Sequence, residues 1–149
     1  MRHHQERLTF ILDPVLKRNL GYSLMLSDVY LWMALRTTLS SVASQMVTKA
    51  GLFLAGAITE SITKHVLKGI ASNRPYKERT ERLLTDRIIS TPMKADLDWI
   101  WDMRNNQHLF LVTNVEFGTY SGAHYDRAAR TIREFIEALQ RRSPNVPGA

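Results

Sequence analysis

The chain of 149 residues contains no cysteine, which excludes disulfides and thiolate metal sites and suits a cytoplasmic protein. Long hydrophobic runs are also lacking, since the longest uncharged apolar run, residues 50–59, is half of the roughly 20 residues that a membrane span needs. Asp13 and Pro14 interrupt the early apolar run of residues 8–12, so no signal peptide is expected. We therefore expect a cytoplasmic protein without membrane association.

No segment alternates apolar and polar residues over the length of a strand, and the sequence has no internal repeat. Apolar residues make up 44% and charged residues 23% of the chain, as in ordinary globular proteins. The length fits one domain with a single core. We expect one domain over residues 1–149, with a core over about 24–142, a short N-terminal segment and a flexible tail over 143–149.

Helical periodicity runs through most of the chain. After a break at Gly21, Ser27 and Asp28 can cap a first helix. In the second helix, the small residues Gly51 and Ala55 would let another helix approach closely. The pattern predicts an all-α, up-and-down bundle of about five helices, over about 27–35, 41–70, 76–89, 91–108 and 123–142.

The net charge of +6 and the isoelectric point near 9.9 favour a polyanionic partner such as RNA, although the same surplus can serve solubility alone. Four basic residues of the third helix region are candidates for tracking an RNA backbone. The alternative is a solvated helix in which these cations interleave with acidic residues. The candidates are Arg74, Lys77, Arg79 and Arg82.

Arg104 and His108 are four residues apart, so they lie on one face of the predicted helix. Leu97 and Trp101 lie on the same face, and their apolar side chains predict that this face is buried. A buried arginine is costly unless it is paired or faces a cleft, so the stripe motivates a site. Arginine offers a planar fork for phosphate, and histidine transfers protons near neutral pH. The alternative is two cations at a helix C-terminus, pointing outward.

The histidines lack zinc-ligand spacing, and the chain has no phosphate-cradling glycine loop. We therefore expect no metal and no cofactor.

Two segments carry a resemblance to a known family. The small-residue run over 50–61, with Glu60 near its end, is followed later by Arg104, Asn105 and His108, then by a loop and a helix with Tyr125 and Phe135. In this order, over about residues 24–139, the chain resembles the HEPN (higher eukaryotes and prokaryotes nucleotide-binding) family.

The resemblance implies a homodimer that cleaves RNA without a metal, as a toxin or defence effector, with an antitoxin or another regulatory protein as a further partner. Arg104 and His108 would be catalytic at a composite dimer-interface site, and Asn105 would orient the phosphate or the histidine. Glu60 would pair with Arg104, or alternatively with Lys64 one turn along.

The family usually places more residues between the arginine and the histidine than the three found here. This spacing favours an alternative function, a catalytically silent HEPN-like module for dimerisation, nucleotide binding or partner binding.

Overall fold

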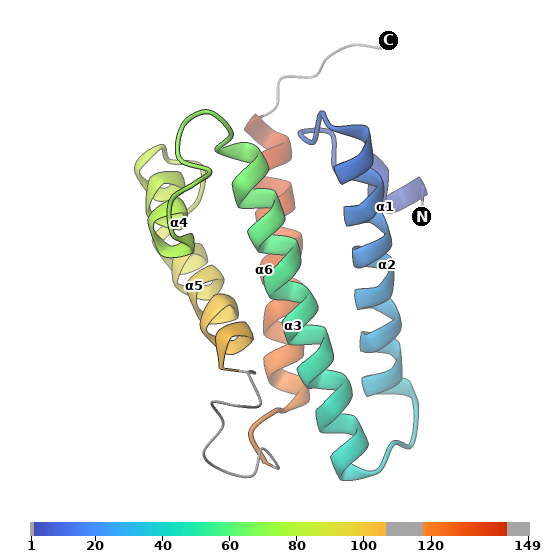
Figure 1. Cartoon of the computed structure of the whole chain (residues 1–149). Helices are drawn as coiled ribbons and strands as arrows, with labels where there is room; N and C mark the ends of the chain where they lie inside the picture. Colours follow the sequence, from blue (N-terminus) through green and yellow to red (C-terminus); the bar gives the residue numbers. More distant parts are fainter. Residues whose placement is uncertain (1, 107–117, 143–149) are drawn as a thin grey trace.

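The computed structural model describes residues 2–106 and 118–142, and within them it contains helices and no strands. The expected all-α bundle is confirmed. In Figure 1, α3 and α6 lie between the α4–α5 pair and the α1–α2 pair. The helices are α1 Arg2–Glu6, α2 Pro14–Arg36, α3 Ser41–Val66, α4 Tyr76–Thr85, α5 Thr91–Asn105 and α6 Gly122–Arg142.

The first long helix, α2, begins much earlier than the sequence predicted. The carboxylate of Asp13 accepts hydrogen bonds from the backbone N–H groups of Val15 and Leu16, and Pro14 occupies the first turn. Gly21 does not break the helix, because it lies buried within α2, where a Cβ would stand 3.1 Å from Gln5.

The predicted cap at Ser27 and Asp28 was therefore wrong, since both residues lie in the interior of α2. Ser27 is buried there and serves tertiary packing instead: its hydroxyl lies 3.0 Å from the Tyr125 hydroxyl of α6. The Tyr125 hydroxyl also donates to the Ser27 carbonyl oxygen. These contacts fasten α2 to α6.

Helix α3 begins where the sequence predicted and contacts α2, α4, α5 and α6. Its buried stripe includes Leu52, Ala55, Ile58 and Ile62. A Cβ at Gly51 would stand 2.6 Å from the Tyr125 ring, so the predicted close approach of a helix at this glycine is confirmed. By length and composition alone α3 is also apolar enough to cross a membrane, and packing against four helices accounts for part of that apolarity.

The core also draws on residues near the N-terminus, because Leu8, Ile11 and Leu20 are buried in it. These three residues precede residue 24, where the sequence placed the start of the core.

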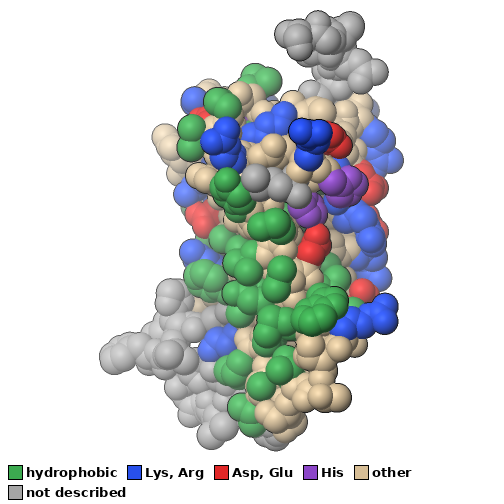
Figure 2. All heavy atoms as spheres, turned by 90° about the vertical axis from the view of Figure 1, so that its right-hand side faces the viewer, with side chains coloured by type: hydrophobic (Ala, Val, Ile, Leu, Met, Phe, Trp, Pro, Cys, Tyr) green, Lys and Arg blue, Asp and Glu red, His purple; other side chains and the backbone are tan. Residues whose placement is uncertain are grey.

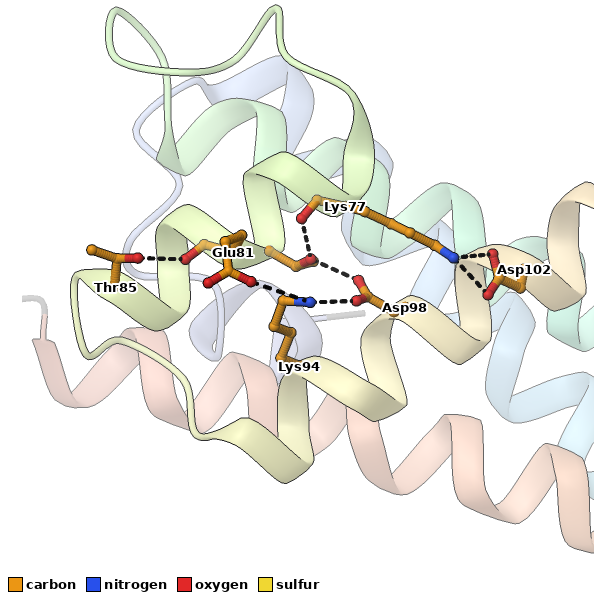
Figure 3. Close-up of polar contacts among 7 residues, drawn as sticks. Lys77, Glu81, Thr85, Lys94, Asp98 and Asp102 are labelled. Carbon is orange, nitrogen blue, oxygen red and sulfur yellow. Dashed lines mark hydrogen bonds and ion pairs between the residues drawn. The ribbon is translucent and has the colours of Figure 1, made fainter.

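Polar contacts hold α4 against α5 (Figure 3). The Lys94 ammonium lies 2.7 Å from an Asp98 carboxylate oxygen and 3.4 Å from Glu81. The buried Thr80 hydroxyl donates to the other Asp98 oxygen at 2.6 Å. Asp98 thus accepts bonds from both helices.

Both helices end earlier than predicted. Helix α4 ends at Thr85 rather than near 89, because Arg87 adopts a left-handed backbone with φ of 54° and the Ile88 N–H turns back to the Leu83 carbonyl. Helix α5 ends at Asn105. The turn after α4 leads into Ser90, which caps α5.

Candidate functional site

Helix α5 presents Arg104 at the edge of its buried stripe. The Ser90 hydroxyl caps the helix by accepting a hydrogen bond from the Met93 N–H. Leu97 and Ile100 are fully buried and fix the rotation of the helix. Arg104, one turn after Ile100, has a side chain that is 27% exposed. The sequence left the orientation of Arg104 open, and the structure places its side chain partly buried at the edge of the core.

The Arg104 guanidinium is held by polar and aromatic neighbours. Its Nη2 lies 3.8 Å from a Glu60 carboxylate oxygen, and its Nη1 donates to the Asn105 Oδ1 at 3.0 Å. Its central carbon lies 4.8 Å from the Trp101 ring centroid and 5.6 Å from that of Phe53. These contacts orient the cation, while its exposed fraction leaves access for an anion.

The buried Arg104 Nε makes no hydrogen bond within the described part of the chain. The ion pair with Glu60 is also long for a charge-assisted bond, for which about 2.7–2.9 Å is usual. Arg104 therefore retains unused hydrogen-bonding capacity on a guanidinium whose orientation is already fixed.

Gly56 of α3 permits the close approach that brings Arg104 to Glu60. A Cβ at position 56 would stand 2.7 Å from both Cβ and Cγ of Arg104. Those are the first atoms of the arginine side chain, so they cannot swing away without moving α5. The sequence pattern predicted a close helix approach at Gly51 and Ala55 of this helix, but not at Gly56.

Glu60 lies near both of its alternative predicted partners. Its Oε1 lies 2.9 Å from the Lys64 ammonium, and its Oε2 is the oxygen nearest to Arg104. Glu60 therefore links the Arg104 site to the next turn of α3, and its backbone carbonyl accepts a hydrogen bond from Arg79 at 3.2 Å.

His108, the second predicted catalytic residue, lies outside the described residues. The structure brings together three of the predicted site residues, Arg104, Asn105 and Glu60. It adds Trp101, which the sequence pattern placed only on an apolar stripe, and Phe53.

The four predicted RNA-binding residues do not form one unpaired basic ridge. Lys77 pairs with Asp102 at 2.8 Å, Arg82 with Asp86 at 2.8 Å, and Arg74 more loosely with Glu78 at 3.7 Å. Arg79 is only 2% exposed. The three exposed cations thus each have a carboxylate neighbour, as the solvated-helix alternative expects, whereas Arg79 points into the protein.

An exposed apolar face lies beside the Arg104 site. Figure 2 shows hydrophobic side chains running as a band over the face that contains α2. We call this band the α2–α3 face. The large exposed apolar residues of the two helices are Tyr22, Met25, Leu26, Val29, Trp32 and Leu35 of α2, and Val42, Met46 and Phe53 of α3; of these, Leu26, Met46 and Phe53 line one groove.

Phe53 joins this face to the Arg104 site. Its ring contacts Arg104, and it also lines a groove of about 430 Å³ together with Leu26, Tyr30 and Met46. Exposed apolar patches of this kind usually mark interaction surfaces. A molecule that covered the α2–α3 face would therefore lie next to Arg104.

Within residues 2–106 and 118–142, no group of three or more His, Asp or Glu side chains is placed to hold a metal ion. A scan against protein-family models, a search of curated proteins and a search of solved structures each found no match.

Proposed function

We propose that this chain is a metal-independent endoribonuclease of HEPN type that acts as a homodimer. The observation that supports it best is the half-buried Arg104, oriented by Asn105, Trp101 and Glu60 at the edge of an exposed apolar face. An oriented, accessible guanidinium is suited to hold the oxygens of a phosphodiester.

In the proposed reaction, the 2′-hydroxyl of RNA attacks the adjacent phosphorus. A bond forms between O2′ and phosphorus, and the bond from phosphorus to O5′ breaks. The proton of the 2′-hydroxyl passes to a base and the departing O5′ receives one, which are the roles proposed for His108 of the two copies. Arg104 stabilises the charge on the phosphoryl oxygens, and Asn105 keeps its guanidinium in place.

The proposed dimer forms through the α2–α3 face. Because Phe53 belongs both to this face and to the surroundings of Arg104, pairing two copies there would bring two Arg104 side chains into one region. Covering the exposed Trp32 and its neighbours would also remove apolar area from water, which favours association.

The proposed setting is the cytoplasm, where a toxin or defence effector of this kind would be restrained by an antitoxin or another regulatory protein. The absence of cysteine and the net charge of +6 suit a reducing compartment and an RNA substrate.

Cleavage of total RNA in the presence of EDTA tests the activity. The wild-type chain should cleave, and Arg104→Ala and His108→Ala should each lose cleavage by at least about 100-fold, the usual scale for removing a charge-stabilising or proton-transferring group. Arg18→Ala is the matched control, because Arg18 is an exposed arginine of α2 that is remote in sequence from the site. Equal cleavage by all four chains would refute the assignment.

The dimer has its own test. Trp32 is 59% exposed, so Trp32→Glu should leave the fold intact while placing a charge in the proposed interface. Sedimentation should show a wild-type dimer and a monomeric variant, with cleavage lost in the variant. A wild-type chain that is monomeric at micromolar concentration would contradict the shared site.

A second function, the catalytically silent binding module, is favoured by the Glu60 carboxylate beside Arg104 and by the short spacing from Arg104 to His108. Glu60 partly neutralises the guanidinium, which is what a structural pair would do. A folded, dimeric wild-type chain that leaves RNA intact would support this function over the nuclease.

A further inference from the structure

A polar pocket of about 480 Å³ opens where α3, the turn before α4, and α5 meet. Three cations, Lys64, Arg74 and Arg79, line it together with one acid, Glu60. The Glu60 carboxylate is already engaged by Lys64 and Arg104. The pocket therefore carries an excess of positive charge that its own acid does not neutralise.

Arg79 is the unusual member of this lining. It is 2% exposed, and among the described residues the charge of the nearby Glu60 carboxylate acts on it without a salt bridge at contact distance. Its Nη1 donates to the Glu60 carbonyl oxygen, its Nε makes no hydrogen bond, and the Tyr76 ring lies 5.4 Å from its central carbon. Burial lowers the pKa of Arg79, and the Glu60 carboxylate offsets part of that shift.

Taking a guanidinium out of water is costly unless a counter-charge contacts it directly, and Glu60 acts on Arg79 only from a distance. The Glu60 carbonyl oxygen and the Tyr76 ring offset only part of this desolvation cost. An anion in the pocket would add negative charge close to Arg79 and an acceptor for its Nε, which makes no hydrogen bond among the described residues.

The start of α4 adds a second reason to expect an anion. The helix begins at Tyr76 after Pro75, which makes no side-chain cap, and both residues line the pocket. The first N–H groups of a helix lack intrahelical partners and carry partial positive charge, so they attract phosphate. Ser72 and Asn73 in the preceding turn add polar side chains to the same wall.

We propose that this pocket binds a phosphate monoester group, contacted by Arg79 at its base, by Arg74 at its rim and by the start of α4. Arg74 is suited to this role because its side chain is 70% exposed and its 3.7 Å pair with Glu78 is loose. The phosphate can belong to the end of a nucleic-acid strand or to a small free molecule. The proposal does not depend on RNA cleavage at Arg104.

Titration calorimetry on the full chain tests the pocket, with inorganic phosphate as the first probe. The wild-type chain should bind it, and Arg74→Gln should weaken binding about tenfold or more, as expected for one lost charge-assisted contact. Arg82→Gln is the matched control, since Arg82 lies on α4 outside the pocket and this variant should bind phosphate like wild type.

Arg79→Met should abolish phosphate binding, and thermal unfolding without phosphate establishes whether that variant is folded. Because Arg74 is exposed, Arg74→Gln decides the proposal even if Arg79→Met does not fold. No binding by the wild type at tens of millimolar phosphate, or equal weakening by Arg74→Gln and Arg82→Gln, would overturn the proposal.

Two oligodeoxyribonucleotides distinguish the sources of the phosphate, because DNA lacks the 2′-hydroxyl that the proposed cleavage requires. Tighter binding of a 5′-phosphorylated strand than of inorganic phosphate would assign the pocket to strand ends. Binding of inorganic phosphate alone would assign it to a small molecule. Equal, Arg74-dependent binding of strands with and without the 5′-phosphate would contradict a monoester site.

Discussion

Replacing Gly56 by alanine tests whether the close approach of α3 and α5 positions Arg104. The added Cβ would stand 2.7 Å from two Arg104 atoms, against the 3.5–4.0 Å of an ordinary carbon contact, so α5 must move by about 1 Å. Overpacking of this kind costs about 1–3 kcal/mol, and the better helix propensity of alanine returns up to about 1 kcal/mol. The free energy of unfolding should fall by about 1–2 kcal/mol.

Urea unfolding followed by circular dichroism measures this change, and the melting temperature should fall by about 2–8 °C for a chain of this size. Gly122→Ala is the matched control, because a Cβ at this first residue of α6 meets no atom within 4 Å. It should leave stability unchanged or slightly raised. A Gly56→Ala chain as stable as Gly122→Ala would refute the reasoning, because α3 and α5 would then accommodate the added Cβ without a steric clash.

Three further predictions concern the polar contacts that join the helices. Asp98→Asn should lower the free energy of unfolding by about 1–2 kcal/mol in urea, because Asp98 accepts bonds from Thr80 and Lys94. The hydrogen bond to Asp98 raises the pKa of Lys94, so its contribution is full below the ordinary lysine pKa of about 10.4 and is lost as pH rises through the folded pKa. The urea midpoint of the wild type should therefore fall above about pH 10 by more than that of Asp98→Asn. Tyr125→Phe should cost about 1–2 kcal/mol in thermal unfolding by removing the buried bonds to Ser27, and an unchanged midpoint would mean that those bonds contribute nothing.

The sequence predicted the fold where local signals agree with tertiary packing. Ser41, Ser90 and the stripe of the last helix gave the starts of three helices to within a residue or so. The break predicted at Gly21 was wrong, because a glycine in a helix interior can allow close packing instead of ending the helix. Here its missing Cβ makes room for Gln5. The cap formed by Asp13 and Pro14 was the stronger local signal.

The site was predictable only in part. The 3.6-residue period placed Arg104 on a stripe with buried residues but left open whether its side chain points outward. It also could not show that Trp101 and Phe53 would flank the guanidinium. The burial of Arg79 could not be predicted from the sequence, because α4 carries several cations interleaved with acids and none of them is distinguished by its spacing. Which cation turns inward depends on how α4 docks against the Glu60 carbonyl and the Tyr76 ring.

Cleavage of one RNA oligonucleotide and of its DNA counterpart, both with EDTA, tests the proposed nuclease most directly. The proposed mechanism predicts that the wild-type chain cuts the RNA, leaves a 2′,3′-cyclic phosphate and a 5′-hydroxyl at the break, and spares the DNA. Cleavage of both strands, or intact RNA in the presence of folded, dimeric protein, would contradict it.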